Sequence, residues 1–384
     1  MSVSFALSDT HQMLRDSVRT FAEKEIRPVA RELDEKEQFS VELTEKMGEL
    51  GLFGILIPEE YGGQGMDYLA YAIACEELAR VDSSQAATIT AHNSLGVGPL
   101  YYFGNEEQRR KYLPLLCTGK KVWGFGLTEP GAGSDSRGSK TTAELRGDYW
   151  VINGSKQWIT NGSCSMNAGI TVQAVSGRAA DGDPELSCFI IDRGTPGFES
   201  RTMHGKLMWR ASDTSELFFN ECAIPAKNLL GDVGAGSKQM LQTLDSGKIG
   251  IAAMGVGLAQ GAYEAALGYA QERRQFGRAL TKFQAIAFKL ADMATKIEVA
   301  RTMLYRLCWM RDTGMRVTKE AAMTKLFCSE IAQEVANEAV QIHGGYGLMK
   351  EYDVERFYRD QRLLQIGEGT SEIQRLIISR QIGC

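Results

Sequence analysis

The sequence has few of the residues that build covalent cross-links or metal sites. Its 384 residues include only 8 cysteines and 4 histidines, and no two cysteines form a Cys-x-x-Cys pair. A His-Glu-x-x-His motif is also missing. A disulfide framework or a zinc site would need such spacings. We therefore expect reduced thiols in a reducing compartment and no protein-bound metal.

Long hydrophobic runs are missing as well. The first twenty residues carry Asp9 and Asp16 where a signal peptide would have an apolar core. Residues 83–105 are uncharged but interrupted by polar side chains, and residues 249–263 are too short to cross a membrane. We expect no membrane insertion, a buried helix at 249–263, and a bacterial cytoplasmic protein in preference to one of the mitochondrial matrix.

A strong charge of one sign is also absent. The chain has 43 Lys or Arg against 48 Asp or Glu, a formal net charge of −5. This balance argues against a general nucleic-acid binder. The hydrophobic share of 43% is enough for a large core, and the length suggests two or three domains.

Three regions of the chain differ in their patterning. Residues 1–120 predict an N-terminal helical domain with helices at 11–24, 42–50, 68–80 and 106–116, and with Ser8 as the cap of the first. Residues 121–228 predict a β domain, a barrel or a sandwich, because short strand-like runs alternate with Gly and Asn turns. Within it, 141–145 and 149–153 predict a hairpin, and 157–160 predicts a further strand. Residues 229–384 predict long helices that end in a four-helix bundle, since apolar residues repeat at three- and four-residue spacing from 286 to 307. The predicted fold class is α+β.

Three segments in the middle of the chain carry residues suited to a ligand. LTEPGAGSD at 127–135 has glycines that let the backbone approach a ligand, although it could equally be a surface turn. NGSKQWITNG at 153–162 places Trp158 where it could form the wall of a flat-ring site or pack into the core. ERRQFG at 272–277 sets arginine beside an aromatic residue, which suits a pyrophosphate next to a ring system or a solvated helix end.

Two further segments follow near the C-terminus. QIHGGYG at 341–347 closes a long helix, so Gly344 could be its C-cap, while adjacent glycines also leave N–H groups free for a diphosphate. EGTSEIQR at 368–375 begins with a carboxylate between two glycines, before a helix that Thr370 could cap. Glu368 could act as a general base if desolvated, or could be an exposed acid in a loop.

Together and in this order, the five segments resemble the acyl-CoA dehydrogenase family over essentially the whole chain. The resemblance implies FAD-dependent α,β-dehydrogenation of an acyl-CoA thioester. Glu368 would be the catalytic base that removes the α-proton, while the β-hydride goes to the flavin. A homotetramer with one FAD in each subunit, re-oxidised by an electron-transferring flavoprotein, is also implied.

The resemblance assigns the other site residues. Flavin contacts are implied for Phe125, Leu127, Thr128, Ser134, Trp158, Ile159 and Thr160. Contacts to the FAD of a neighbouring subunit are implied for Arg273, Gln275, Phe276, Gln284, Gln341, Gly344 and Gly345. The adenosine diphosphate site would be completed by Thr370 and Glu372. The acyl-CoA substrate would lie near Ser134, Asp245, Lys248, Gly367, Gly369 and Arg380.

The residue before the base departs from the family pattern. Gly367 stands where most straight-chain members have tyrosine. The isovaleryl enzymes also have this glycine but place their base on another helix, where this chain has Gly247. An open pocket floor at Gly367 predicts a substrate branched or cyclic near the thioester, such as cyclohexanecarboxyl-CoA, isobutyryl-CoA or 2-methylbutyryl-CoA. Met208 or Trp209 could refill that space.

Other readings stay open beside this one. Lys248 replaces a usual arginine and keeps its charge without the planar fork. A straight short-chain dehydrogenase acting on butyryl-CoA is the main alternative for the substrate. A DNA-associated member of the superfamily would need a basic C-terminal region, but residues 229–384 hold 20 Lys or Arg and 17 Asp or Glu, a net charge of only +3.

Overall fold

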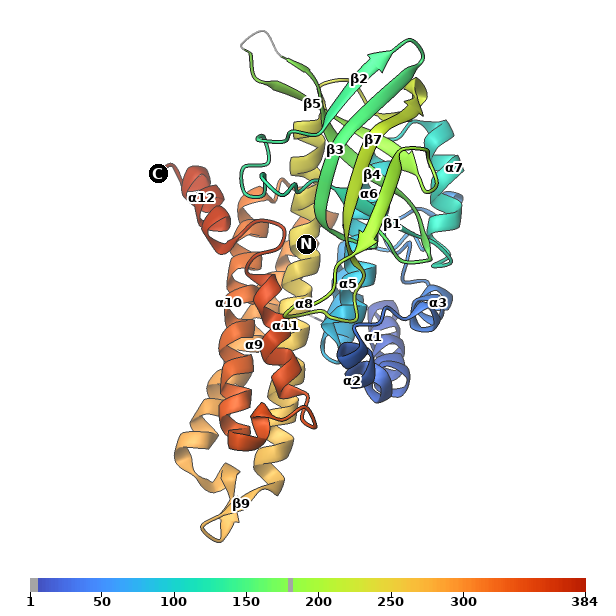
Figure 1. Ribbon diagram of the computed structural model, residues 1–384. Helices are drawn as coiled ribbons and strands as arrows, with labels where there is room; N and C mark the ends of the chain where they lie inside the picture. Colours follow the sequence, from blue (N-terminus) through green and yellow to red (C-terminus); the bar gives the residue numbers. More distant parts are fainter. Residues whose placement is uncertain (1–5, 179–181) are drawn as a thin grey trace.

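The structure is a computed structural model that describes residues 6–178 and 182–384. N-terminal helices, a β-sheet and a C-terminal helical bundle follow one another along the chain, and the long helix α8, Gly236–Glu272, runs through the whole molecule (Figure 1). This order confirms the predicted α+β fold with a helical, a β and a second helical part. No helix of the described ranges is long and apolar enough to cross a membrane.

The N-terminal part contains more helix than the sequence predicted. Ser8 caps the first helix as expected, since its side chain accepts a hydrogen bond from the backbone N–H of His11. Helix α5 was not predicted, because its residues are small or polar and almost all buried, so they show no amphipathic period. The helices are α1 (Asp9–Phe21), α2 (Arg27–Lys36), α3 (Val41–Glu49), α4 (Tyr68–Ala79), α5 (Ser83–Ala91), α6 (Gly98–Phe103) and α7 (Glu106–Leu116), with π-helical turns at Ala22–Ile26 and His92–Val97.

The middle part is an eight-stranded sheet. Seven strands follow the order β6-β7-β3-β2-β4-β5-β8, and the eighth, β1, pairs in parallel with β4. The predicted hairpin is present as β2 and β3. The strands predicted separately at 149–153 and 157–160 are one strand, because the chain passes through Gly154 with only a local shift in register. The strands are β1 (Val122–Gly126), β2 (Thr142–Arg146), β3 (Tyr149–Thr160), β4 (Asn167–Arg178), β5 (Pro184–Asp192), β6 (Phe198–Thr202), β7 (Thr214–Pro225) and β8 (Leu229–Leu230).

The C-terminal part packs α8 against α9, α10 and α11, and α12 packs on α10. Their bounds are α9 (Gln284–Asp312), α10 (Thr318–His343), α11 (Val354–Leu364) and α12 (Ser371–Ile382), and a small hairpin, β9 (Arg274–Gln275) with β10 (Arg278–Ala279), lies at the far tip. The glycines of α8 allow close packing on α4. A Cβ added at Gly257 would lie 2.1 Å from the backbone oxygen of Glu76, and one at Gly261 would lie 2.1 Å from that of Arg80.

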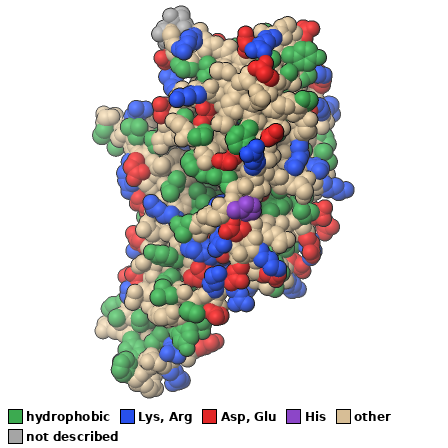
Figure 2. Space-filling view, viewed as in Figure 1, with side chains coloured by type: hydrophobic (Ala, Val, Ile, Leu, Met, Phe, Trp, Pro, Cys, Tyr) green, Lys and Arg blue, Asp and Glu red, His purple; other side chains and the backbone are tan. Residues whose placement is uncertain are grey.

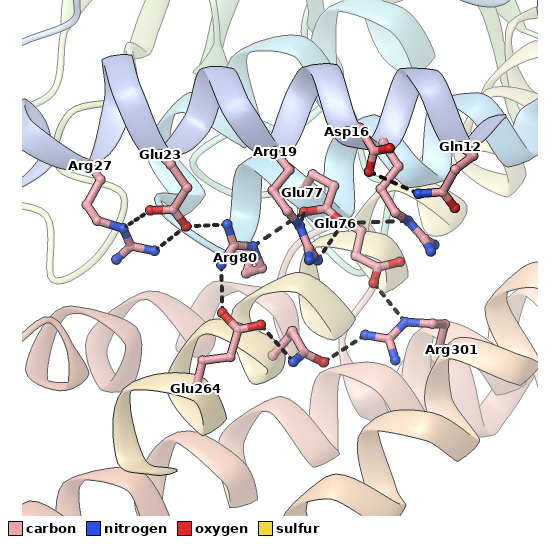
Figure 3. Close-up of polar contacts among 12 residues, drawn as sticks. Gln12, Asp16, Arg19, Glu23, Arg27, Glu76, Glu77, Arg80, Glu264 and Arg301 are labelled. Atoms are coloured by element: carbon pink, nitrogen blue, oxygen red, sulfur yellow. Dashed lines mark hydrogen bonds and ion pairs between the residues drawn. The ribbon is translucent and has the colours of Figure 1, made fainter. Parts of the chain in front are cut away.

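Charged side chains also join the N-terminal helices to the bundle (Figure 3). Arg80 on α4 lies at the centre of this ionic network and is almost fully buried. It contacts Glu77 on its own helix, Glu23 in the π-helical turn, and Glu264 on α8 at 2.6 Å. Arg301 on α9 adds a contact of 2.8 Å to Glu76. Because each buried carboxylate has a guanidinium partner, the charges can be buried together.

Candidate active site

A cavity of about 430 Å³ lies where β1, β3, α5, α8 and the loop before α12 meet. Its size and mostly apolar lining suit a small-molecule site. Twelve of the residues that the sequence predicted for the site line it, from four distant parts of the chain: Phe125, Leu127, Thr128, Ser134, Trp158, Ile159, Thr160, Lys248, Gly367, Glu368, Gly369 and Thr370. The fold therefore brings the candidate base and the candidate ring contacts into one space.

Glu368 reaches this cavity from a sharp turn between α11 and α12. Its backbone has a φ of 53°, and Gly369 follows with a φ of 96°. The carboxyl group points at α8, since a Cβ added at Gly247 would lie 1.8 Å from Oε2 of Glu368. That oxygen is buried and has no hydrogen-bond partner among the described residues. An unpartnered carboxylate oxygen in a substrate-sized cavity is free to accept a proton.

The electrostatics of Glu368 suit a base that works near neutral pH. Burial raises the pKa of its carboxyl to about 7, while the positive charges of Lys325 and Lys248 act in the opposite direction. Burial disfavours the charged form of an acid, and a nearby cation favours it. The desolvated glutamate proposed from the sequence is therefore present, and the exposed acid is not.

Three side chains hold the turn around Glu368. Lys325 on α10 donates to the backbone oxygen of Gly369 at 2.8 Å. Gln374 donates its side-chain amide to the backbone oxygens of Glu368 and Gly369. Thr370 caps α12, as predicted, by accepting from the N–H of Ile373. Lys325 was not predicted from the sequence, although a single lysine within the uncharged surroundings of 321–329 could have indicated a buried cation.

The part of the cavity lining at Leu127 and Thr128 is held by a buried ion pair. Lys156 on β3 lies 2.7 Å from Glu129 and also donates to the backbone oxygen of Leu127. Glu129 accepts further hydrogen bonds from the backbone of Lys140 and Thr141. Although burial alone would raise it, the Lys156 ammonium lowers the pKa of Glu129 to about 2. Both residues belong to predicted motifs, yet their pairing was not foreseen.

Trp158 lies at the cavity edge and does not pack into the core. Its backbone has a φ of 59°, and the residue is 57% exposed. The neighbouring Ile159 is buried, and both residues line the cavity with Thr160. A bulky residue rarely adopts such a φ unless its surroundings demand it. The indole and the residues around it fit a flat ring bound against β3.

Among the residues predicted for the substrate and for the adenosine diphosphate site, three lie outside the cavity lining, namely Asp245, Glu372 and Arg380. Asp245 is nonetheless adjacent to it, because its carboxylate pairs with the buried Lys248 at 2.7 Å and accepts from Thr318. Glu372 and Arg380 are exposed on α12. The structure thus places a compensated charge, Lys248 with Asp245, beside the cavity.

A second hollow at the other end of the bundle gathers four more predicted residues, Arg273, Gln275, Gly344 and Gly345. Gly344 caps α10 with a φ of 60°, and the buried His343 stacks on Tyr269. Phe276 lies at the hairpin tip and is 93% exposed, in a region where Figure 2 shows hydrophobic side chains on the surface. Gln284 and Gln341 are exposed nearby and do not line the hollow.

The two groups of predicted cofactor residues are therefore far apart within one chain. The hairpin β9–β10 lies at one end of α8, and the β-sheet packs at the other (Figure 1).

Within the described ranges, no group of three or more His, Cys, Asp or Glu side chains could hold a metal ion.

Comparisons with known proteins cover nearly the whole chain. Family models match as the N-terminal, middle and C-terminal domains of acyl-CoA dehydrogenase over residues 8–120, 124–222 and 234–383. A probable acyl-CoA dehydrogenase of Bacillus subtilis, YngJ, is 50% identical over 99% of this chain and 100% of its own. The mitochondrial short-chain specific acyl-CoA dehydrogenase of Rattus norvegicus is 46% identical over 98% of this chain and 90% of its own.

Solved structures agree with the sequence matches. A chain from a structural study of the electron transferring flavoprotein of Acidaminococcus fermentans and flavin-based electron bifurcation superposes with a TM-score of 0.96. It is 44% identical and covers 99% of this chain and 100% of its own. With three family models in order, and relatives well above 30% identity over at least 90% of their own length, this chain belongs to the acyl-CoA dehydrogenase family.

Proposed function

We propose that the protein dehydrogenates straight short-chain acyl-CoA thioesters, with butyryl-CoA as the representative substrate, and delivers electrons to an electron-transferring flavoprotein. Its membership makes it an FAD-dependent oxidoreductase. The observation that carries the proposal is the carboxylate of Glu368 in the cavity, whose Oε2 is buried and has no hydrogen-bond partner among the described residues.

Glu368 is suited to the proton transfer that the reaction requires. The α-proton of a thioester is only weakly acidic, so its removal needs a base held in a water-poor site. The Glu368 carboxyl has these surroundings and a pKa of about 7, so it is partly ionised at neutral pH and can accept the proton. Bound FAD supplies the acceptor for the hydride that leaves the β-carbon.

The residues of β1 and β3 would hold the flavin ring. Phe125, Thr128, Trp158 and Thr160 line the same cavity as Glu368. The Glu129–Lys156 pair fixes the loop that begins at Leu127, because Lys156 bonds both Glu129 and the Leu127 oxygen. A rigid wall of this kind keeps the ring oriented without further contacts.

The relatives and the residues around Gly367 bear on the shape of the acyl group. The Rattus norvegicus relative is a short-chain specific enzyme, which favours the straight-chain alternative over the branched or cyclic substrate expected from Gly367. Gly367 does leave room, since an added Cβ would meet Leu363 only at ordinary contact distance. Trp209, which was expected to be able to refill such space, is buried and lines the same cavity.

Tyr71 is the side chain that would limit the acyl length. It is fully buried on α4, and its hydroxyl donates to the backbone oxygen of Thr90, a residue of the cavity lining. A Cβ added at Gly250 on α8 would lie 2.3 Å from that hydroxyl. The phenol thus fills the space between α4, α5 and α8 behind the cavity, where a longer acyl chain would extend.

The electron route is proposed from the position of Trp158. Its exposed indole connects the cavity edge with the surface, which suits transfer to a docked flavoprotein. A structural relative comes from a study of an electron transferring flavoprotein.

Anaerobic bleaching of the bound flavin tests the proposal. Butyryl-CoA, hexanoyl-CoA and octanoyl-CoA would be compared with isobutyryl-CoA, 2-methylbutyryl-CoA and cyclohexanecarboxyl-CoA on the purified holoenzyme. Fastest reduction by butyryl-CoA is the expected result. Fastest reduction by a branched or cyclic thioester would restore the interpretation of Gly367 as an open floor, and absence of bleaching by all six would refute the proposed substrate class.

A further inference from the structure

Lys325 is one of the largest side chains that are fully buried in this protein. It lies on the buried face of α10, and lysine is almost never buried in this way without a partner. Its one hydrogen bond in the described residues runs to the backbone oxygen of Gly369 at 2.8 Å, and no carboxylate lies within ion-pair distance. A cation in this position has a cost that the fold must offset elsewhere.

We propose that Lys325 is a positioning residue for the base: it fixes the turn that presents Glu368 and keeps the carboxylate ionised for proton abstraction. This inference rests on the proposed function in assigning Glu368 as the base, and it adds a role for a residue that does not line the cavity.

The first half of this role follows from the backbone. Two consecutive residues, Glu368 and Gly369, have positive φ values, and such a turn persists only where its surroundings specify it. The Gly369 oxygen accepts from both Lys325 and Gln374, so α10 and α12 each hold the turn. The Glu368 side chain is then directed at Gly247 on α8, where no side chain occupies the space.

The second half follows from the charges that face Glu368. From α8, Lys248 faces it, but Asp245 compensates that lysine at 2.7 Å. From α4, Tyr71 and Cys75 face it, and burial keeps both neutral by raising their pKa values. The remaining charge is Lys325 on α10, the cation without a paired carboxylate. Glu372 on α12 and Glu330 on α10 act on Lys325 from a greater distance.

The protonation states of the two groups are matched to neutral pH. Burial lowers the pKa of the Lys325 ammonium to about 8, against the opposing effect of Glu368. Burial raises the pKa of Glu368 to about 7, and Lys325 is the first of the cations that hold it down. Between these values the lysine is charged while the carboxylate is ionised. Without the lysine, ionisation would need a higher pH.

The test is the pH profile of kcat/KM for the holoenzyme with butyryl-CoA. The acid limb of this profile reports the base of the free enzyme. In Lys325→Met the limb should move upward by about one pH unit, the shift expected for loss of one nearby opposite charge. Activity at alkaline pH should approach that of the parent. Lys36→Met on α2, which removes an equally charged but exposed lysine, should leave the profile in place.

A second variant separates charge from hydrogen bonding. Lys325→Gln keeps a donor with a reach one atom shorter, and it carries no charge. It should show the same shift, because the charge sets the limb. An unshifted limb in both variants, with activity reduced equally at every pH, would overturn the proposal and leave Lys325 a purely structural residue.

Unfolding measurements test the same coupling without substrate. A carboxyl whose pKa rises on folding loses stability as the pH increases from its unfolded value to its folded value. The stability gained by Glu368→Gln should therefore grow from about pH 4.5 and level off near pH 7. In the Lys325→Met background, the stability gained by Glu368→Gln should level off at a higher pH than in the parent. An unchanged plateau would contradict the proposal even if butyryl-CoA is not the substrate.

Discussion

At the scale of single residues, Glu368 has the environment of a base, and replacing it tests that role. Glu368→Gln keeps the size of the side chain and removes its ability to accept the α-proton. Loss of a positioned general base costs about 10²- to 10⁴-fold in rate. We expect bleaching of the flavin by butyryl-CoA to slow by at least that lower factor while FAD content stays unchanged.

The absorbance of the bound flavin after mixing would provide the measurement. A variant that bleaches as fast as the parent would show that another group removes the proton. Loss of FAD from the variant would make the comparison uninformative about chemistry, so the ratio of flavin to protein absorbance is the control to record first.

Tyr71 gives a second prediction at this scale, on acyl length. Tyr71→Ala should raise kcat/KM for hexanoyl-CoA relative to butyryl-CoA by about tenfold, because one added methylene in an apolar pocket is worth 10- to 200-fold. Tyr71→Phe removes only the hydroxyl that bonds the Thr90 oxygen and is the matched control.

The control should retain the short-chain preference, since the ring still fills the space behind Thr90. An unchanged ratio of the two thioesters in Tyr71→Ala would mean that another side chain sets the depth. The truncation should also lower the free energy of unfolding by about 3 kcal/mol, as expected for a buried aromatic residue.

Candidate site residues could be picked out where they belong to a sequence motif, and less readily where only their burial in the fold distinguishes them. Glu368, Trp158 and Thr370 could be proposed from the sequence because their neighbours in sequence are unusual. Tyr71 and Lys325 were not, because each lies on an ordinary helix and acts through a segment distant in sequence. Single-sequence reasoning has no access to such contacts.

At the scale of elements, the contact between β3 and the loop after β1 depends on the buried ion pair of Lys156 and Glu129. Lys156→Met would leave Glu129 buried without its cation, which typically costs about 3–5 kcal/mol. We expect lower retention of FAD on gel filtration and a lower melting temperature. Lys140→Met, which removes an exposed lysine from the same loop, should leave both unchanged.

This ion pair also makes the stability of the loop depend on pH in the acid range. Because the pKa of Glu129 is depressed to about 2, its stabilising contribution is present above its unfolded pKa near 4.5 and falls as the pH drops toward 2. FAD release on acidification should therefore begin below about pH 4.5 in the parent. A release curve in Lys156→Met that matches the parent would contradict this role.

The boundaries of elements were predictable where the sequence shows an amphipathic period or turn residues. The hairpin β2–β3 and the helix Glu106–Leu116 were expected in their observed places. Strand β1 was missed because all five of its residues are buried, so it has no alternation, and β6 was missed because it is short and mostly exposed. Tertiary contacts with β4 and β7 create these two strands.

At the scale of the whole molecule, the ionic network of Figure 3 holds the N-terminal helices on the bundle. Arg80→Met should lower the free energy of unfolding by about 3 kcal/mol, because it leaves the buried Glu77 with fewer cations and removes a link to Glu264. Arg146→Met, whose pairs with Glu144 and Glu221 are exposed, should change it by less than about 0.5 kcal/mol.

Thermal unfolding of the two holoenzyme variants provides the comparison. Equal melting temperatures would show that the network contributes specificity of packing and little stability. The pKa of Glu23 is lowered to about 2 by its bond to Arg27 and by Arg80, so the network should weaken only as the pH falls below about 4.5.

Helix α8 has a consequence for how the chain can be divided. It packs against α4 of the N-terminal part, β5 of the sheet, and α9 and α10 of the bundle, and it spans about 55 Å at the usual helical rise. Its glycines at 257 and 261 leave no gap to α4. Amide hydrogens in its middle should therefore exchange with solvent only when the entire protein opens. A gene cut near residue 229 would yield two fragments that recover activity only when co-expressed.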